Sequence, residues 1–122
     1  MRELKFRCWN NCTRKYIPEN ELMENFAEYL GEDHLYIEQY TGLNDKNGKE
    51  ICEGDIVNYS DGCICVVQYE DEGARFIHRD ISDDFPFGFN RLEEYDGEEY
   101  DGELFEVIGN THENPELLGG EG

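Results

Sequence analysis

Residues 40–59, YTGLNDKNGKEICEGDIVNY, constrain the fold of this chain more than any other segment, because turn signals and strand signals alternate closely within them. Asn47-Gly48 favours a tight turn in which two successive residues take positive φ. Gly54 suits a sharp bend into a strand over 55–59, and 49–52 is interpreted as a short link before it. The middle of the chain therefore predicts turn, link and strand in close succession.

The residues after this segment predict an antiparallel meander. Asp61-Gly62 lies between two apolar runs, 55–59 and 63–70, and this pattern is typical of a β-hairpin. Both faces of the 63–70 run are apolar, which favours a central strand. A third strand is predicted over 74–81. Three short strands joined by tight turns are the usual core of a small barrel or curled sheet.

The N-terminal residues predict a second hairpin and the only helix. Leu4, Phe6 and Cys8 alternate with charged residues, so they predict a strand, and Asn10-Asn11 turns the chain into a returning strand over 12–17. A helix is predicted over 21–30, capped by Asn20 and ended by Gly31 in a positive-φ conformation. The apolar residues of this helix form one stripe: Leu22, Phe26, Tyr29 and Leu30.

The remaining elements are shorter. A strand is predicted over 35–39, and a loop over 82–90 carries three Phe rings that we expect to fill the core. A final strand is predicted over 104–108, and a single turn over 112–118. The fold class expected from all these elements is α+β, mainly β, with a small barrel-like or curled antiparallel sheet and one helix. Because 122 residues suit one domain, we expect a single domain over 1–118 and a flexible tail over 119–122.

The charge of the chain limits its partners. It has 30 acidic and 10 basic residues, for a net charge of −20, and half of the basic residues lie within the first 15 positions. A charge this negative opposes binding to DNA and to anionic membranes and favours basic partners. The sequence has no apolar run long enough for a membrane span and no signal-peptide pattern, and five cysteines favour free thiols in a reducing cytosol.

Three separated segments resemble the YopX family of phage and prophage proteins. They are the opening MRELKFRCW, residues 39–57 with the LNDKNGKEI and EGDIV motifs, and FEVIGNTHENPELL at 105–118. The resemblance implies a small, β-rich protein in the cytoplasm of a bacterial host, and it implies no reaction, cofactor or catalytic residue. The helix near 21–30 and the acidic stretch near 91–103 look unlike the core of the family, so this member's own specificity is expected there.

The sequence favours neither a metal site nor an active site. Cys8 and Cys12 are separated by three residues, and Cys63 and Cys65 by one, whereas a structural zinc site usually shows two close ligand pairs. Packed or exposed thiols are therefore favoured over zinc. The chain has no Gly-rich phosphate loop, nucleophile elbow or HExxH motif. We therefore expect no catalytic residues, no metal and no cofactor, and we expect that the protein is not an enzyme.

Direct binding of nucleic acid would have to use four cations near the N-terminus, Lys5, Arg7, Arg14 and Lys15, together with Trp9. The predicted hairpin can place Lys5, Arg7 and Trp9 on one face. The alternative is that these cations pair with the acidic residues of the same chain. The second interpretation is favoured because the rest of the molecule would repel phosphates.

The densest acidic segment is EEYDGEEYDGE at 93–103, which contains EYDGE twice and no basic residue. We expect its acidic and aromatic side chains to bind a partner, the tyrosines as interface anchors: Glu93, Glu94, Tyr95, Asp96, Glu98, Glu99, Tyr100, Asp101 and Glu103. The alternative is a solvated loop that only adds solubility.

The function expected from these features is a non-enzymatic phage or prophage accessory that binds a basic protein through an acidic surface. Its sharpest form is a DNA-mimic-like inhibitor of a host nucleic-acid-binding or defence protein. The alternative is a phage assembly or replication accessory that uses an apolar sheet or helix interface without mimicry. The sequence leaves homo-oligomerisation open.

Overall fold

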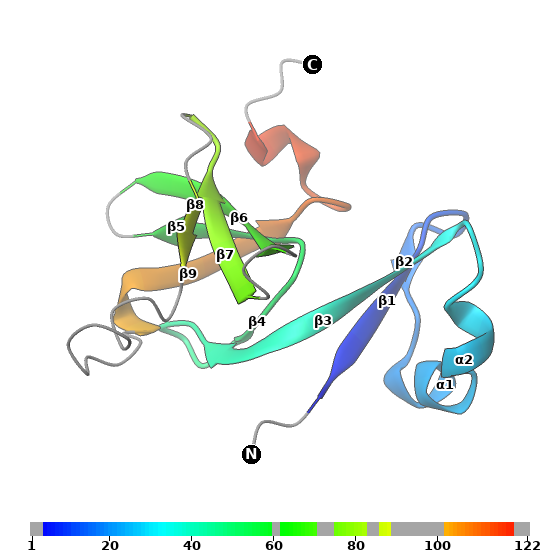
Figure 1. Ribbon diagram of the computed structural model, residues 1–122. Coiled ribbons are helices and arrows are strands. Elements are labelled where there is room, and N and C mark those ends of the chain that lie inside the picture. Colours follow the sequence, from blue (N-terminus) through cyan, green and yellow to red (C-terminus); the bar gives the residue numbers. More distant parts are fainter. Residues whose placement is uncertain (1–3, 60–61, 71–74, 83–85, 89–101, 119–122) are drawn as a thin grey trace.

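The structure, a computed structural model, describes residues 4–59, 62–70, 75–82, 86–88 and 102–118. Its strands form two antiparallel sheets (Figure 1). The first sheet has the order β2-β1-β3-β4, with β1 Phe6–Asn10, β2 Lys15–Tyr16, β3 Leu35–Asn44 and β4 Glu50–Cys52. The second has the order β8-β7-β6-β5-β9, with β5 Asp55–Tyr59, β6 Cys63–Glu70, β7 Arg75–Asp80, β8 Pro86–Gly88 and β9 Phe105–Asn110. The predicted fold class, mainly β with a curled antiparallel sheet, is confirmed.

Both predicted hairpins are present. In the first, Trp9 of β1 lies opposite Tyr16 of β2, so the returning strand is shorter than predicted. In the second, β5 pairs with β6 from Ile56 opposite Val66 to Tyr59 opposite Cys63. The strand β6 is the central strand of its sheet, as its two apolar faces predict.

The predicted single helix is divided into two short ones, α1 Glu19–Glu24 and α2 Phe26–Tyr29. Asn25 separates them with φ −122° and ψ 21°, and its side-chain amide donates a hydrogen bond to the Glu21 carbonyl. An Asn side chain that bonds the local backbone in this way competes with helix continuation. Asn20 lies inside α1 instead of capping it, and Gly31 has no positive φ, so both of these predictions were wrong.

The central turn differs from the predicted two-residue turn. The Gly48 amide donates to the Asp45 carbonyl at 3.0 Å, and the Asp45 amide donates to the Lys49 carbonyl at 2.8 Å. Among the residues of this turn, only Gly48 has positive φ (82°). The loop is therefore a three-residue turn that ends in a glycine bulge. The predicted link at 49–52 contains the strand β4, which pairs with β3.

Gly54 forms the predicted bend into β5 with φ 90°. A Cβ atom at this position would lie 2.5 Å from the carboxylate oxygen Oε2 of Glu38, so the site excludes any side chain as well as favouring positive φ. The bend is attached to the second sheet, since the Gly54 amide donates to the Val67 carbonyl of β6 and the Gly54 carbonyl accepts from the amide of Thr111, directly after β9.

The C-terminal half follows the prediction with one correction. Part of the predicted 82–90 loop is the strand β8, which pairs with β7, and the Phe side chains of this segment lie outside the described residues. The final strand is β9, which pairs with β5, and the predicted last turn is the 3₁₀ helix η2, Pro115–Leu118. The hydrophobic core joins Ile51 of β4 in the first sheet to four buried apolar residues of the second sheet: Val57, Cys65, Val67 and Phe105.

Candidate protein-binding surface

Most of the acidic segment predicted to bind a partner lies outside the described residues. Glu93, Glu94, Tyr95, Asp96, Glu98, Glu99, Tyr100 and Asp101 belong to this part. Glu103 is described: it is an exposed residue in the 3₁₀ helix η1, Gly102–Leu104, just before β9. The role of 93–103 therefore stays a prediction.

Two of the four N-terminal cations that could have bound nucleic acid form ion pairs within the molecule. Lys5 forms an ion pair with Glu50 at 2.6 Å and lies over the Tyr40 ring. Arg7 is directed between the sheets, and Trp9 is only 1% exposed. For Lys5 and Arg7 the structure agrees with the interpretation that the cations pair internally.

Arg14 and Lys15 are exposed and belong to none of the ion pairs within 4.0 Å among the described residues. Arg14 instead donates to the Asn11 side chain and to the His112 carbonyl.

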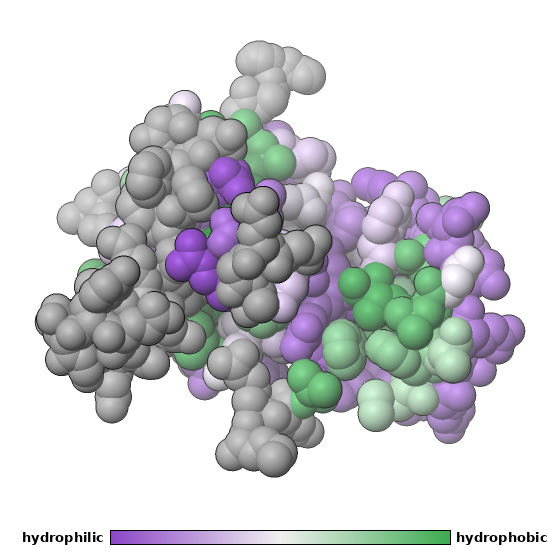
Figure 2. Space-filling model, in the orientation of Figure 1, coloured by the Kyte–Doolittle hydropathy of each residue, from purple (hydrophilic) through white to green (hydrophobic). Residues whose placement is uncertain are grey.

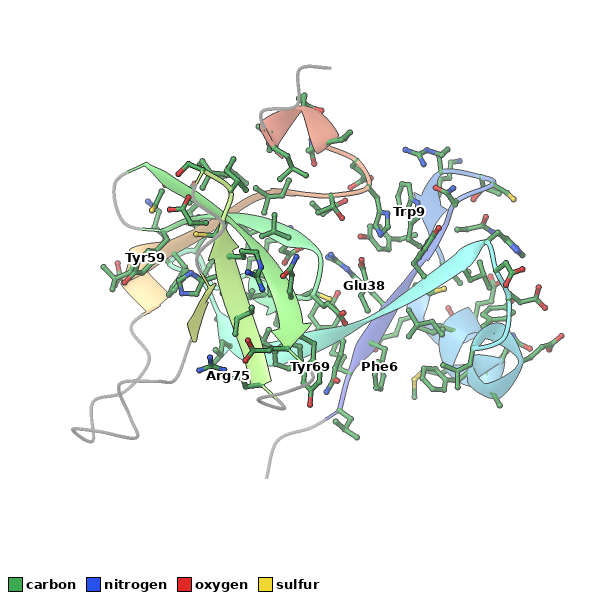
Figure 3. All side chains as sticks on the ribbon, turned by 45° about the horizontal axis from the view of Figure 1, so that its top comes forward. Phe6, Trp9, Glu38, Tyr59, Tyr69 and Arg75 are labelled. Carbon is green, nitrogen blue, oxygen red and sulfur yellow. The ribbon has the colours of Figure 1, made fainter. Side chains whose placement is uncertain are left out.

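Arg7 is the centre of a buried polar network that joins three strands. Its Nε donates to Glu38 Oε1 at 2.8 Å, and its Nη2 lies 2.9 Å from Asp55 Oδ1 and 3.2 Å from the carbonyl of Glu53. Glu38 is opposite Arg7 in the β1–β3 register, so the sheet itself sets this pair. Figure 3 shows Glu38 in the region where the two sheets meet. The network links β1 and β3 of one sheet to β5 of the other.

Two further groups complete the hydrogen bonding of Glu38. The Tyr16 hydroxyl donates to Oε1 at 3.2 Å, and His112 Nε2 lies 2.9 Å from Oε2. The His112 ring also stacks on Trp9, with centroids 4.8 Å apart and planes inclined by 7°. The segment after β9 is thereby attached to the N-terminal hairpin.

Burial and charge act in opposite directions on the pKa values of this network. Burial raises the pKa of Asp55, although the Arg7 guanidinium and the Cys52 amide act against it. Burial would lower the pKa of Arg7, but the Asp55 and Glu38 carboxylates outweigh it, so the pKa lies above its usual value. Burial also raises the pKa of Tyr16. Arg7 therefore stays charged and Tyr16 stays protonated near neutral pH.

A pocket of about 400 Å³ lies beside this network, between β1, β2 and α1 and the residues after β9. Arg7 and Tyr16 are among its lining residues, with Lys5, Lys49, Glu19 and Glu113. Among these lining residues, Arg7 and Tyr16 have the most strongly shifted pKa values. Because both pKa values are raised, both side chains keep their protons near neutral pH. A general acid or base needs a pKa near the working pH, and neither group has one.

The cysteines are free thiols in varied surroundings. Cys8, Cys52 and Cys65 are buried, Cys63 is half-buried, and Cys12 is exposed. Burial raises the pKa of Cys52 and of Cys8, which makes both poor nucleophiles. Within the described ranges, no group of three or more His, Cys, Asp or Glu residues is arranged to hold a metal ion.

Asp45, in the central motif, is a structural acceptor. Its Oδ1 accepts the amides of Asn47 and Lys49 at 2.9 Å, and its Oδ2 accepts the amide of Val107 at 2.8 Å. Burial alone would raise the pKa of Asp45, but these backbone donors outweigh it and lower the pKa. The carboxylate thus joins the β3–β4 turn to β9, 62 residues away in the chain.

We predict that Asp45→Ala lowers the free energy of unfolding by about 2 kcal/mol at pH 7, because several charge-assisted hydrogen bonds are lost. Since the folded-state pKa is lowered, the stabilisation is complete above the unfolded pKa of about 4 and is lost as the pH falls below it. Urea unfolding at pH 7 and pH 3 should therefore show a smaller difference between wild type and variant at pH 3. Asp33→Ala, at an exposed position, is the control. An equal difference at both pH values would contradict the assignment.

The surface of α1 and α2 combines exposed apolar side chains with carboxylates. Met23 is 68% exposed and Leu30 60%, and Leu4, just before β1, is 68% exposed. The Phe26 ring packs on Phe6 of β1 at 5.1 Å, so the apolar surface of the helices continues onto the start of the strand. Figure 2 shows this region as a gathering of hydrophobic atoms, bordered on the outer side by hydrophilic ones.

The border of this surface is acidic. Residues 19–33 contain six acidic residues and no Lys or Arg: Glu19, Glu21, Glu24, Glu28, Glu32 and Asp33. All six are exposed. Among the described residues, the ion pairs within 4.0 Å include only one of these six, Glu32 with His34 at 4.0 Å. We call this region the helical surface: Leu4, Met23, Phe26 and Leu30 with the six acidic residues.

Comparisons with known proteins concern the whole chain. A family model described as "YopX protein" matches residues 5–119. A crystal structure of protein EF1440 from Enterococcus faecalis is similar, with a TM-score of 0.61 and 23% sequence identity, over 97% of this chain and 99% of that chain. At this identity the likeness shows the fold alone. No curated protein matches the sequence.

Proposed function

The chain belongs to the YopX protein family, and on this premise we propose that it acts as a non-enzymatic accessory protein of a phage or prophage that binds a basic protein through an acidic surface. The observation that carries the proposal is the uneven use of charge. Lys5 and Arg7 form ion pairs within the molecule, whereas the acidic residues of α1 and α2 point to solvent. A surface of this kind attracts cationic partners over distances of about 8 Å at physiological salt.

No described helix is long and apolar enough to cross a membrane, so the proposal places no part of the described chain in a bilayer. Arg7 and Tyr16, the two groups beside the pocket with the most strongly shifted pKa values, are part of the buried network, which supports a binding role over a catalytic one.

A second candidate site within the same function is the predicted segment 93–103, where seven acidic residues and two tyrosines occupy eleven positions. Such a density favours a DNA-mimic-like inhibitor that occupies the basic groove of a host nucleic-acid-binding or defence protein. Competition by duplex DNA separates this version from binding without mimicry.

We predict that proteins captured from a bacterial host by the immobilised chain are basic and are released as the salt concentration rises from about 0.1 to 1 M, because screening weakens the attraction. Replacement of the seven acidic residues of 93–103 by Asn and Gln should abolish capture if that segment is the site. The matched variant replaces Glu21, Glu24 and Glu28 by Gln. Mass spectrometry identifies the captured proteins, and capture that is insensitive to salt would contradict the proposal.

A further inference from the structure

We infer that the helical surface binds a basic amphipathic helix of the partner, with apolar side chains on Met23, Phe26 and Leu30 and lysines or arginines on the surrounding carboxylates. The inference rests on the proposed function and deepens it, because it names the surface and the chemistry of the segment that binds.

The apolar part of the helical surface extends beyond the residues that pack against β1. Leu22 of α1 is 1% exposed, and Phe26 packs on Phe6, so these two residues attach the helices to β1. Met23 lies in α1 and Leu30 directly follows α2, and these two residues are 68% and 60% exposed. Contiguous exposed apolar residues with a polar border are typical of interaction sites. Figure 2 shows such an apolar gathering over the helices.

The surface is held in shape before any partner arrives. The Tyr29 hydroxyl of α2 donates to the Glu21 carboxylate of α1 at 2.8 Å, and the Asn25 side chain donates to the Glu21 carbonyl at 2.9 Å. These bonds fix α2 relative to α1, so binding does not need to order the two helices. Preorganisation of this kind lowers the entropy cost of binding.

The charge of the border decides the class of partner. With six acidic residues and no Lys or Arg over 19–33, the surface repels another copy of this chain, whose net charge is −20. The same charge disfavours nucleic acid and anionic lipid. A protein segment that carries both apolar anchors and cations satisfies both parts of the surface.

The partner segment is inferred to be helical because the surface offers apolar side chains and carboxylates side by side. An amphipathic helix presents apolar and basic side chains on adjoining faces, so one short segment can contact Met23, Phe26 and Leu30 and the acidic border at the same time. Ion pairs between the lysines or arginines of the partner helix and the carboxylates at the border then fix the orientation of that helix on the surface.

The test uses the full chain with a benzophenone amino acid at position 23, expressed in a bacterial host and illuminated before purification. The matched control carries the same group at position 104, where Leu104 is 41% exposed in η1 next to the predicted acidic segment. Figure 1 places α1 and the start of β9 at opposite ends of the molecule. We expect a cross-link from position 23 to a partner peptide that carries several Lys or Arg residues and an amphipathic helical pattern.

Several results would overturn the inference: no cross-link from position 23, an equal yield of the same partner from position 104, a cross-link to a second copy of this chain, or a peptide without excess basic residues. A basic partner that is cross-linked only from position 104 would leave the proposed function in place and remove the helical surface as its site. A partner without excess basic charge at either position would contradict both.

A second measurement uses the partner identified in this way. The double variant Met23→Gln with Leu30→Gln should weaken binding of this partner at least tenfold. The double variant Glu24→Lys with Glu28→Lys should also weaken binding, and its effect should be larger at low salt than at 1 M salt. All four positions are exposed, so the variants should keep the wild-type circular dichroism spectrum and unfolding midpoint. Unchanged affinity in folded variants would contradict the inference.

Discussion

Arg7→Met is expected to lower the free energy of unfolding by about 3–5 kcal/mol, the typical cost of removing one member of a buried ionic group. The side chain of Arg7 is 14% exposed, that of Glu38 10% and that of Asp55 1%. Without the guanidinium, two carboxylates remain buried close together with no cation between them. Urea unfolding followed by the fluorescence of the single Trp measures the effect, since the Trp9 side chain is buried in the folded state.

The control for Arg7 is Arg75→Met. Arg75 forms an ion pair with Glu70 at 3.0 Å, but both side chains are partly exposed, and surface pairs contribute at most about 1 kcal/mol. The double variant Arg7→Met with Asp55→Asn should recover part of the lost stability because it removes one of the uncompensated charges. A loss below about 1 kcal/mol for Arg7→Met would show that the network does not hold the two sheets together.

Local chemistry explains why so much of the fold could be predicted from the sequence. Asn10-Asn11 and Asp61-Gly62 are turn signals that act through the chemistry of a few neighbouring residues, and the strands that they were predicted to join are paired as hairpins. Two of the errors are segments that were interpreted as a link or a loop and that instead pair with a neighbouring strand. The 49–52 segment becomes a strand only because β3 offers it a partner, and the 86–88 segment does so beside β7.

The candidate site was predicted only in part. The sequence marked the helix near 21–30 as a place for specificity, but the strongest signal, the acidic repeat, fell in residues that the structure does not describe. The exposure of Met23 and Leu30 depends on how α1 and α2 divide at Asn25, which no periodic pattern indicates. A run of six acidic residues without a base over 19–33 was visible in the sequence and could have drawn attention to this surface.

The Arg7–Asp55 ion pair could not be predicted because it joins residues 48 positions apart on different sheets. The motifs that carry the family resemblance contain both residues, and the structure gives them a role in the fold: Arg7 and Asp55 join the sheets, Asp45 joins a turn to β9, and Gly54 leaves room for Glu38. A motif made of structural residues identifies the fold without identifying the partner. Specificity is then expected on surfaces outside the motifs, which is where the helical surface lies apart from Leu4.

Trp9→Ala is expected to lower the free energy of unfolding by about 3–5 kcal/mol, as is usual when a large buried aromatic side chain is removed. Trp9 is 1% exposed and lies between three groups: the stacked His112 ring, the edge of Tyr16 at 5.0 Å and the Arg14 guanidinium at 5.2 Å. Far-UV circular dichroism follows unfolding in this variant, which has no Trp. Tyr69→Ala is the control, because Tyr69 is 42% exposed and should cost much less.

The same variant tests whether the stack attaches the C-terminal segment. Removal of the indole leaves His112 with its Glu38 contact but without its aromatic neighbour in the hairpin. Amide hydrogen exchange over 111–118 should therefore accelerate more than exchange in β6, the central strand of the second sheet. Trp9→Phe keeps an aromatic face for His112 and should restore most of the protection, although it loses the indole hydrogen bond to Asn11. Equal acceleration in both regions would mean that Trp9 stabilises the whole domain without a particular role in holding the last turn.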